Sequence, residues 1–305
     1  MKKIVALAVA FICVVSLQAK GDLHLFEADN KSGKITPTMI EEAFTANGFK
    51  TAVNSEMNRP YQIQFKQTDF KVFNLLTVYH AKLSHDLVKK YPKAGVFTPL
   101  GVGIYQGKNE DTIHVSTLTS EAQAKILGFD DELLKSIEKE VLKAIKSVMP
   151  NAKYKLSEDS LKESRDLVTT YKLDLDGEDA EEMREEVEMA LDSGFKPAGF
   201  VMANYLDLNE ELVDSGKSSP FDFYVAYSIC KLKVIYTVSK TRPEASAFAP
   251  CTLAVYKKKD EDKIVMEFPG VYNWMSSAKV EDKEAKEVLM KAQEDFESIL
   301  KEITE

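Results

Sequence analysis

Two short stretches of the chain carry apolar residues every three or four positions, the spacing of a helix that buries one face. Thr36 and Asp179 precede these stretches, and their side chains are suited to cap a helix N-terminus. Gly48 and Gly194 follow, and glycine readily adopts the left-handed conformation that ends many helices. The pattern predicts two equivalent amphipathic helices, each ending at a Gly-Phe pair, 146 residues apart.

Each half of the chain also ends in a longer amphipathic stretch, Leu134–Val148 and Leu289–Ile303. Between the helices lie short runs rich in β-branched and aromatic residues, which indicate strands. These runs are Phe70 to Val78, Leu100 to Tyr105 and Ile113 to Leu118 in the first half, and Phe221 to Cys230, Thr252 to Tyr256 and Ile264 to Phe268 in the second. Turns rich in Asp and Asn at 108–111 and 259–262 predict hairpins, and hence antiparallel pairing.

The two halves repeat one another. Three identities share a spacing of 151 residues: Pro92 with Pro243, Pro99 with Pro250, and Tyr105 with Tyr256. A fixed spacing of this kind is typical of an internal duplication. We therefore expect an α+β protein of two tandem two-layer units, 20–150 and 151–305, each an antiparallel sheet with helices on one face. The polar stretch Met149–Arg165 is the expected linker.

Residues 1–19 have the layout of a secretory signal peptide: Lys2 and Lys3, an apolar run from Ile4 to Val15, and the small residue Ala19. We expect cleavage after Ala19 and a periplasmic location. The apolar run is shorter than the roughly 20 residues that a membrane-spanning helix needs, so no stable membrane insertion is expected after cleavage.

The formal net charge is −9, and it becomes −11 once Lys2 and Lys3 are removed. Nucleic acid and anionic lipid both favour basic proteins, so the composition argues against either as a partner. An unknown small molecule or an envelope protein remains as the expected partner.

The second half resembles a bacterial family catalogued as domain of unknown function 302. The resemblance rests on the strand that ends at Cys230, on the helix that follows it, and on the entry Phe248-Ala249-Pro250-Cys251 into the next strand. It implies a fold similar to the two-layer arrangement of the TATA-binding protein, in tandem copies, and implies no activity. The chain departs from the family pattern in two ways: Lys231-Leu232 follows Cys230 in place of Asn-Pro, and the first copy has Thr77-Val78 and Pro99-Leu100 where the cysteines would stand.

Cys230 and Cys251 are the candidate catalytic residues, because strands that meet at one end of a sheet can bring two sulfurs together. They are interpreted as a redox pair, as thiolate metal ligands, as a structural disulfide, or as two small core residues; no CxxC spacing selects among these.

Aromatic side chains are concentrated around the same strands. Phe223 and Tyr227 share one face by the period of two, and Phe221 is expected to join them. Either these side chains pack in the core or they line an apolar groove. The candidate ligand-binding residues are Phe223, Tyr224, Tyr227, Pro250, Tyr256 and Trp274.

No familiar catalytic, phosphate-binding or haem-binding motif occurs, and His80 and His85 are five residues apart, which does not place two imidazoles on one helical face. We therefore expect no metal and no cofactor. The sequence favours a periplasmic binding or accessory protein that holds a small apolar ligand or a protein partner. The alternative is a thiol-dependent redox or metal-linked enzyme that uses Cys230 and Cys251.

Overall fold

The computed structural model describes residues 21–163, 167–214, 216 and 218–305. The predicted signal peptide lies outside these residues, so its cleavage and the export of the chain stay predictions. Within the described residues no helix is both long enough and apolar enough to cross a membrane.

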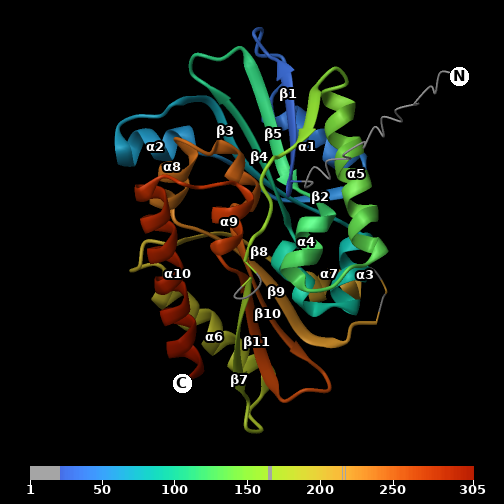
Figure 1. Cartoon of the computed structure of the whole chain (residues 1–305). Coiled ribbons are helices and arrows are strands. Elements are labelled where there is room, and N and C mark those ends of the chain that lie inside the picture. The colour runs from blue at the N-terminus through green and yellow to red at the C-terminus, as the bar shows by residue number, and fades with distance from the viewer. Residues whose placement is uncertain (1–20, 164–166, 215, 217) are drawn as a thin grey trace, which may run out of the picture.

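One order of elements occurs twice along the chain (Figure 1). The first repeat contains β1 (Leu23–Asp29), α1 (Pro37–Ala46), β2 (Phe49–Glu56), α2 (Asn58–Phe65), β3 (Phe70–His80), α3 (Leu83–Lys90), the 3-10 helix η1 (Pro92–Phe97), β4 (Leu100–Gly107), β5 (Thr112–Leu118), α4 (Ser120–Leu127) and α5 (Glu132–Val148). The second repeat contains β7 (Val168–Asp174), α6 (Ala180–Phe195), β8 (Val201–Asp207), α7 (Leu208–Asp214), β9 (Phe221–Cys230), α8 (Leu232–Ser239), η2 (Pro243–Phe248), β10 (Cys251–Lys258), β11 (Lys263–Pro269), α9 (Tyr272–Ser277) and α10 (Lys283–Thr304). The predicted α+β class with two repeated units is confirmed.

The strands form two antiparallel sheets with the orders β2-β3-β4-β5-β1-β6 and β7-β11-β10-β9-β8. The register is the same in both, since Phe73 pairs with Tyr105 and Tyr224 pairs with Tyr256. Strand β6 (Lys153–Leu156) has no counterpart in the second sheet and pairs with β1. The stretch Met149–Arg165 was expected to be a linker. For the residues of β6 this expectation is wrong, because they add an edge strand to the first sheet.

The helix caps form as expected. Thr36 and Asp179 accept hydrogen bonds from backbone N–H groups in the first turns of α1 and α6, and Asp131 and Asp282 do the same for α5 and α10.

The prediction that Gly194 ends its helix is wrong. Helix α6 continues through Gly194 to Phe195, and the left-handed glycine is Gly199, with φ +80°, as Gly48 has φ +85°. Gly48 and Gly199 are 151 residues apart, so the repeat keeps one spacing here. Gly194 has a packing role, because a Cβ atom there would lie 2.6 Å from Ile299 Cγ2 on α10.

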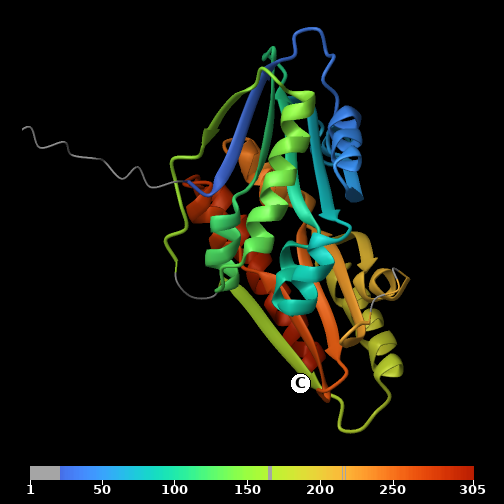
Figure 2. The same cartoon turned by 90° about the vertical axis from the view of Figure 1, so that its right-hand side faces the viewer.

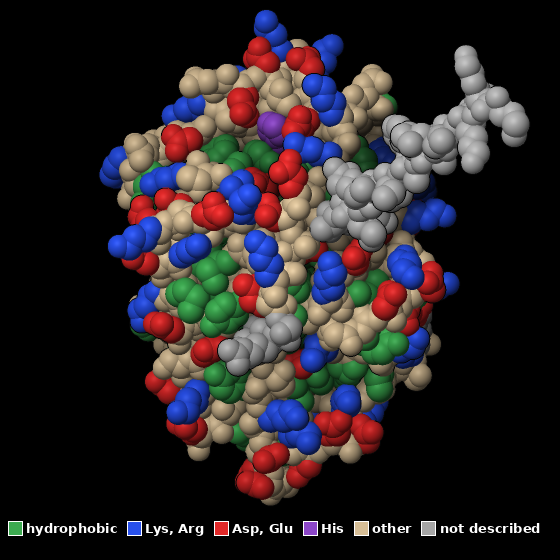
Figure 3. All heavy atoms as spheres, viewed as in Figure 1, with side chains coloured by type: hydrophobic (Ala, Val, Ile, Leu, Met, Phe, Trp, Pro, Cys, Tyr) green, Lys and Arg blue, Asp and Glu red, His purple; other side chains and the backbone are tan. Residues whose placement is uncertain are grey.

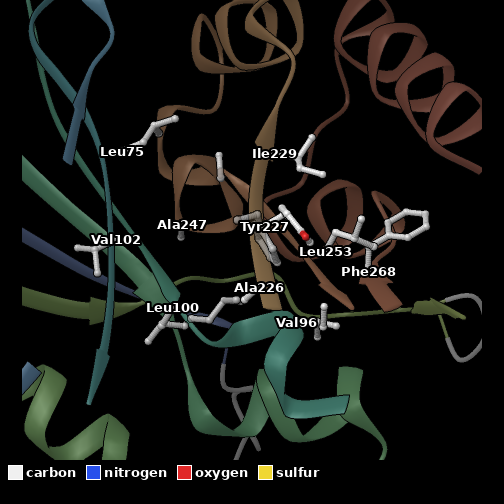
Figure 4. Close-up of a cluster of buried hydrophobic side chains, with 14 of the residues drawn as sticks. Leu75, Val96, Leu100, Val102, Ala226, Tyr227, Ile229, Ala247, Leu253 and Phe268 are labelled. Atoms are coloured by element: carbon white, nitrogen blue, oxygen red, sulfur yellow. The ribbon is translucent and has the colours of Figure 1, made fainter. Parts of the chain in front are cut away.

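Each sheet carries its long helices on one face and contacts the other repeat with the opposite face (Figures 1 and 2). Helix η2 lies on β4 and β5, and η1 lies on β10 and β11, so each repeat inserts the equivalent segment into its neighbour. Figure 4 shows Val96 and Leu100 of the first repeat in one cluster with Ala226 and Leu253 of the second. The two repeats are therefore packed against each other.

Two short helices add further contacts between the repeats. Helix α2 reaches across to α8, where Phe65 stacks on Tyr236 with ring centroids 3.9 Å apart. Helix α7 of the second repeat in turn contacts the first repeat, where its Glu211 accepts a hydrogen bond from the Tyr79 hydroxyl at 2.6 Å. The two repeats thus form a pseudo-symmetric pair with a continuous core.

Candidate functional site

Cys230 ends β9 and Cys251 begins β10, and Cys251 pairs with Ile229, so both cysteines lie at the same end of the second sheet. Both are free thiols. The structural disulfide considered from the sequence is therefore not formed here.

The strand register shows which residues of the first repeat are equivalent to the two cysteines. Leu100 is equivalent to Cys251, as expected, but Tyr79 rather than Val78 is equivalent to Cys230, because Tyr79 pairs with Lys50 as Cys230 pairs with Val201. A phenol and an isobutyl group are both larger than a thiol. The second repeat therefore has less side-chain volume at this point of the fold than the first.

A small apolar cavity lies at this point, with a volume of about 40 Å³. Besides the two cysteines its walls include Phe200, Val234, Phe268, Trp274, Leu289 and Phe296. Helix α10 supplies Leu289 and Phe296 and closes the cavity from the side opposite the sheet. This volume suits a molecule of a few atoms and is far below the roughly 300–1,000 Å³ of sites for drug-sized ligands.

Trp274 contributes to this wall a polar N–H group that lacks a regular partner. It is 3 % exposed, and its indole N–H approaches the Cys251 sulfur without a regular hydrogen bond and meets no other acceptor among the described residues. A buried N–H without an acceptor costs about 1–3 kcal/mol. An acceptor atom brought by a ligand would remove that cost.

The thiols themselves are poorly suited to chemistry at neutral pH. Burial raises the pKa of Cys230 to about 11, and burial together with the nearby Cys230 raises that of Cys251 to about 12. The thiolate is the nucleophile and the metal ligand, so raised pKa values argue against a thiol-dependent enzyme.

We expect iodoacetamide to label the folded protein very slowly. With a pKa of about 11, about one Cys230 thiol in a thousand is ionised at pH 8. Labelling at pH 8, followed by intact mass, should be at least about a hundredfold slower than after unfolding in urea. Equal rates before and after unfolding would show that a thiol is ionised and accessible, and would revive the enzyme hypothesis.

The other candidate ligand-binding residues lie elsewhere. Phe223 and Tyr227 face α6, where Arg184 covers the Phe223 ring and the Tyr227 hydroxyl donates to Glu188 at 2.8 Å. Tyr224 and Tyr256 stack on the opposite face, with ring centroids 5.0 Å apart, against the first repeat. The Tyr224 hydroxyl donates to the Pro92 carbonyl at 2.6 Å. Pro250 follows a cis peptide bond ahead of β10. Of the aromatic set, only Trp274 lines the cavity beside the cysteines.

Phe221 does not join Phe223 as expected. The pairing of β9 with β10 is irregular at Asp222, since Lys257 pairs with Phe223 and Lys258 with Phe221. Such a bulge turns the next side chain to the other face of the sheet. The Phe221 ring accordingly contacts Tyr224 and Tyr256, at 4.9 and 5.9 Å between centroids.

Sequence reasoning missed a polar network in an open groove of about 860 Å³ on the first repeat. His24 hydrogen-bonds Glu138 through Nε2 at 2.8 Å and Tyr154 through Nδ1 at 3.0 Å, and Glu138 also accepts from the Ser120 hydroxyl and N–H. Burial raises the pKa of Glu138, but these hydrogen bonds outweigh it and hold the pKa below its usual range. No sequence signal joins residues that come from β1, α4, α5 and β6.

His80 and His85 do not meet at a metal site. His80 Nδ1 faces the backbone N–H groups of Lys82 and Leu83, and His85 Nε2 lies 3.4 Å from Glu211. Across the described parts of the chain, no three His, Cys, Asp or Glu side chains are grouped to hold a metal ion.

Fold and site together define a tandem α+β protein whose two repeats have diverged at one end of the sheet. The chain belongs to the family described as domain of unknown function DUF302, whose model matches it twice, over residues 27–152 and 179–303. A crystal structure of an uncharacterised conserved protein of that family from Bacillus stearothermophilus is 19 % identical, with a TM-score of 0.36 over 45 % of this chain and 98 % of that one. Among curated proteins, nothing matches this chain.

Proposed function

We propose that this protein is exported to the periplasm and there binds a small, largely apolar molecule that carries one hydrogen-bond acceptor. The observation that carries the proposal is the apolar cavity of the second repeat, which is lined by Trp274, a buried residue whose indole N–H has no regular acceptor among the described residues. The signal-peptide pattern of residues 1–19 supports the location.

Two features favour binding over catalysis. The walls of the cavity are almost wholly apolar, which suits retention of an apolar molecule. The thiols beside it are held protonated by burial, so they act as small wall residues. The volume of about 40 Å³ limits the ligand to a few atoms unless α10 moves away from the sheet.

The test fills the cavity by replacing Cys251 with leucine, the residue at the equivalent position of the first repeat. Acetone is a suitable probe because it is small and has one acceptor, and isobutene has the same shape without the acceptor. Saturation-transfer NMR should detect acetone binding to the wild-type chain and weaker binding of isobutene. Cys251→Leu should abolish both signals, whereas Cys251→Ala, which does not fill the space, should preserve them.

Native mass spectrometry of protein purified from periplasm should then identify the natural ligand. Two results would refute the proposal: acetone binding that is unchanged in Cys251→Leu, or a protein that is free of small molecules and co-purifies with a partner polypeptide. The second result would instead support an accessory role through a protein partner.

A further inference from the structure

A second cavity, which we call the seam pocket, lies where the first sheet meets the second repeat. Its volume is about 410 Å³, within the range of small-molecule sites. Strands β1, β5 and β4 form one wall, and the segment from the end of α8 to η2 forms the other. The pocket is distinct from the cavity beside the cysteines.

The register aligns its main side chains. Glu27 on β1 pairs with His114 on β5, and His114 pairs with Tyr105 on β4. Directly paired residues in an antiparallel sheet share one face, so all three face the second repeat. The His114 and Tyr105 rings are stacked, 4.9 Å apart with an interplanar angle of 6°.

Tyr105 is the unusual member of this set. Its side chain is 8 % exposed and lines the seam pocket, yet its hydroxyl has no hydrogen-bond partner among the described residues. The equivalent Tyr256 in the second repeat donates to Glu267 at 3.0 Å. In the first repeat Ser116 stands in the place of Glu267, and its hydroxyl donates to the Glu244 carbonyl. The first repeat therefore lacks an equivalent internal partner for its tyrosine.

Carboxylates surround that hydroxyl. Burial and then the charges of Glu244, Glu27 and Glu110 raise the pKa of Tyr105. Their partners leave an excess of negative charge: Glu110 faces His114 at 3.4 Å, Glu27 lies 4.0 Å from the exposed Lys155, and Glu244 lies 3.5 Å from Arg242. The remaining charged residues of the lining are Asp69 and Lys240, and the Lys240 ammonium lies over the Tyr236 ring.

These features match the chemistry of an ammonium group. An ammonium offers three donors and a positive charge, which carboxylates and a phenol oxygen can accept. The face of an aromatic ring also attracts a cation. We propose that the seam pocket binds a small organic cation with a primary ammonium group, held by Glu110 and Glu244 and by the hydroxyl of Tyr105.

The probe for this proposal is n-butylammonium chloride, titrated into the full chain by isothermal calorimetry, with n-butanol as the uncharged match. We expect butylammonium to bind and butanol not to bind. Tyr105→Phe removes only the hydroxyl and should weaken binding about tenfold or more. Glu244→Gln, which keeps the shape of the side chain, should weaken it by a similar factor.

Tyr256→Phe is the matched control, because it removes the equivalent hydroxyl from the second repeat. It should leave the Kd for butylammonium unchanged, and circular dichroism should show that each variant is folded. Should Tyr105→Phe fail to fold, Glu110→Gln provides the same comparison. Absence of butylammonium binding, equal binding of butanol, or equal losses in Tyr105→Phe and Tyr256→Phe would overturn the proposal.

Discussion

Replacing Gly101 with alanine should destabilise the folded chain by about 3 kcal/mol, an overpacking cost at the upper end of its usual range. A Cβ atom on Gly101 would lie 2.4 Å from the backbone oxygen of Ala247 in the other repeat. A backbone carbonyl cannot rotate away as a side chain can, so β4 and η2 would have to separate. Urea unfolding of both proteins measures the loss as a difference in the free energy of unfolding.

Gly107→Ala is the control, because Gly107 lies on the same strand. Its added Cβ would first meet Glu110 Oε2 at 3.0 Å, the far end of a flexible side chain. The change in stability should therefore stay within about 1 kcal/mol. If the two alanine variants unfold at the same urea concentration, the close contact between β4 and η2 does not hold the repeats together.

The duplicated fold was predictable because its signals are local. Each half has capping residues at equivalent helix starts, similar strand compositions and similar hairpin turns, and these signals act on local structure in either half. The spacing of 151 residues between Pro92 and Pro243 persists through the paired strands. Gly194 was misleading because a glycine beside a phenylalanine resembles a helix end, whereas this glycine is needed for contact with Ile299.

The sites were much less predictable. Cys230 and Cys251 were singled out from the sequence, and their role stays a prediction. The cavity beside them could not be predicted, because it depends on side chains smaller than Tyr79 and Leu100 of the first repeat, and no motif marks such a difference. Aromatic composition left open whether Tyr224 packs in the core or lines a groove, and that residue is buried at the contact between repeats.

The seam pocket was even harder to predict from the sequence. Tyr105 looks like its counterpart Tyr256 in the sequence, and only the register shows that Ser116 has replaced the carboxylate partner. Contacts between repeats are long-range, so a periodic pattern read along one chain does not report them.

Asp22→Ala should also cost about 3 kcal/mol, since hydrogen bonds to a charged group contribute about 1.5–3 kcal/mol each. Asp22 is 1 % exposed, and its Oδ2 accepts from the Ser277 hydroxyl and from the Leu161 N–H, both at 2.5 Å. One carboxylate thereby joins the first repeat, the segment between the repeats and α9. Removing it leaves the buried Ser277 hydroxyl and the partly buried Leu161 N–H without this acceptor, and urea unfolding should report the loss.

Asp29→Ala, at the exposed end of β1, the strand that follows Asp22, should change stability by less than about 0.5 kcal/mol. Ser277→Ala completes a double-mutant cycle in which the losses should not add, because both variants break the same hydrogen bond. Hydrogen exchange then locates the damage. In Asp22→Ala the Leu161 amide should exchange faster than amides in β4, because the segment between the repeats opens before the sheets unfold. Additive losses with unchanged exchange at Leu161 would mean that the repeats are held together without this carboxylate.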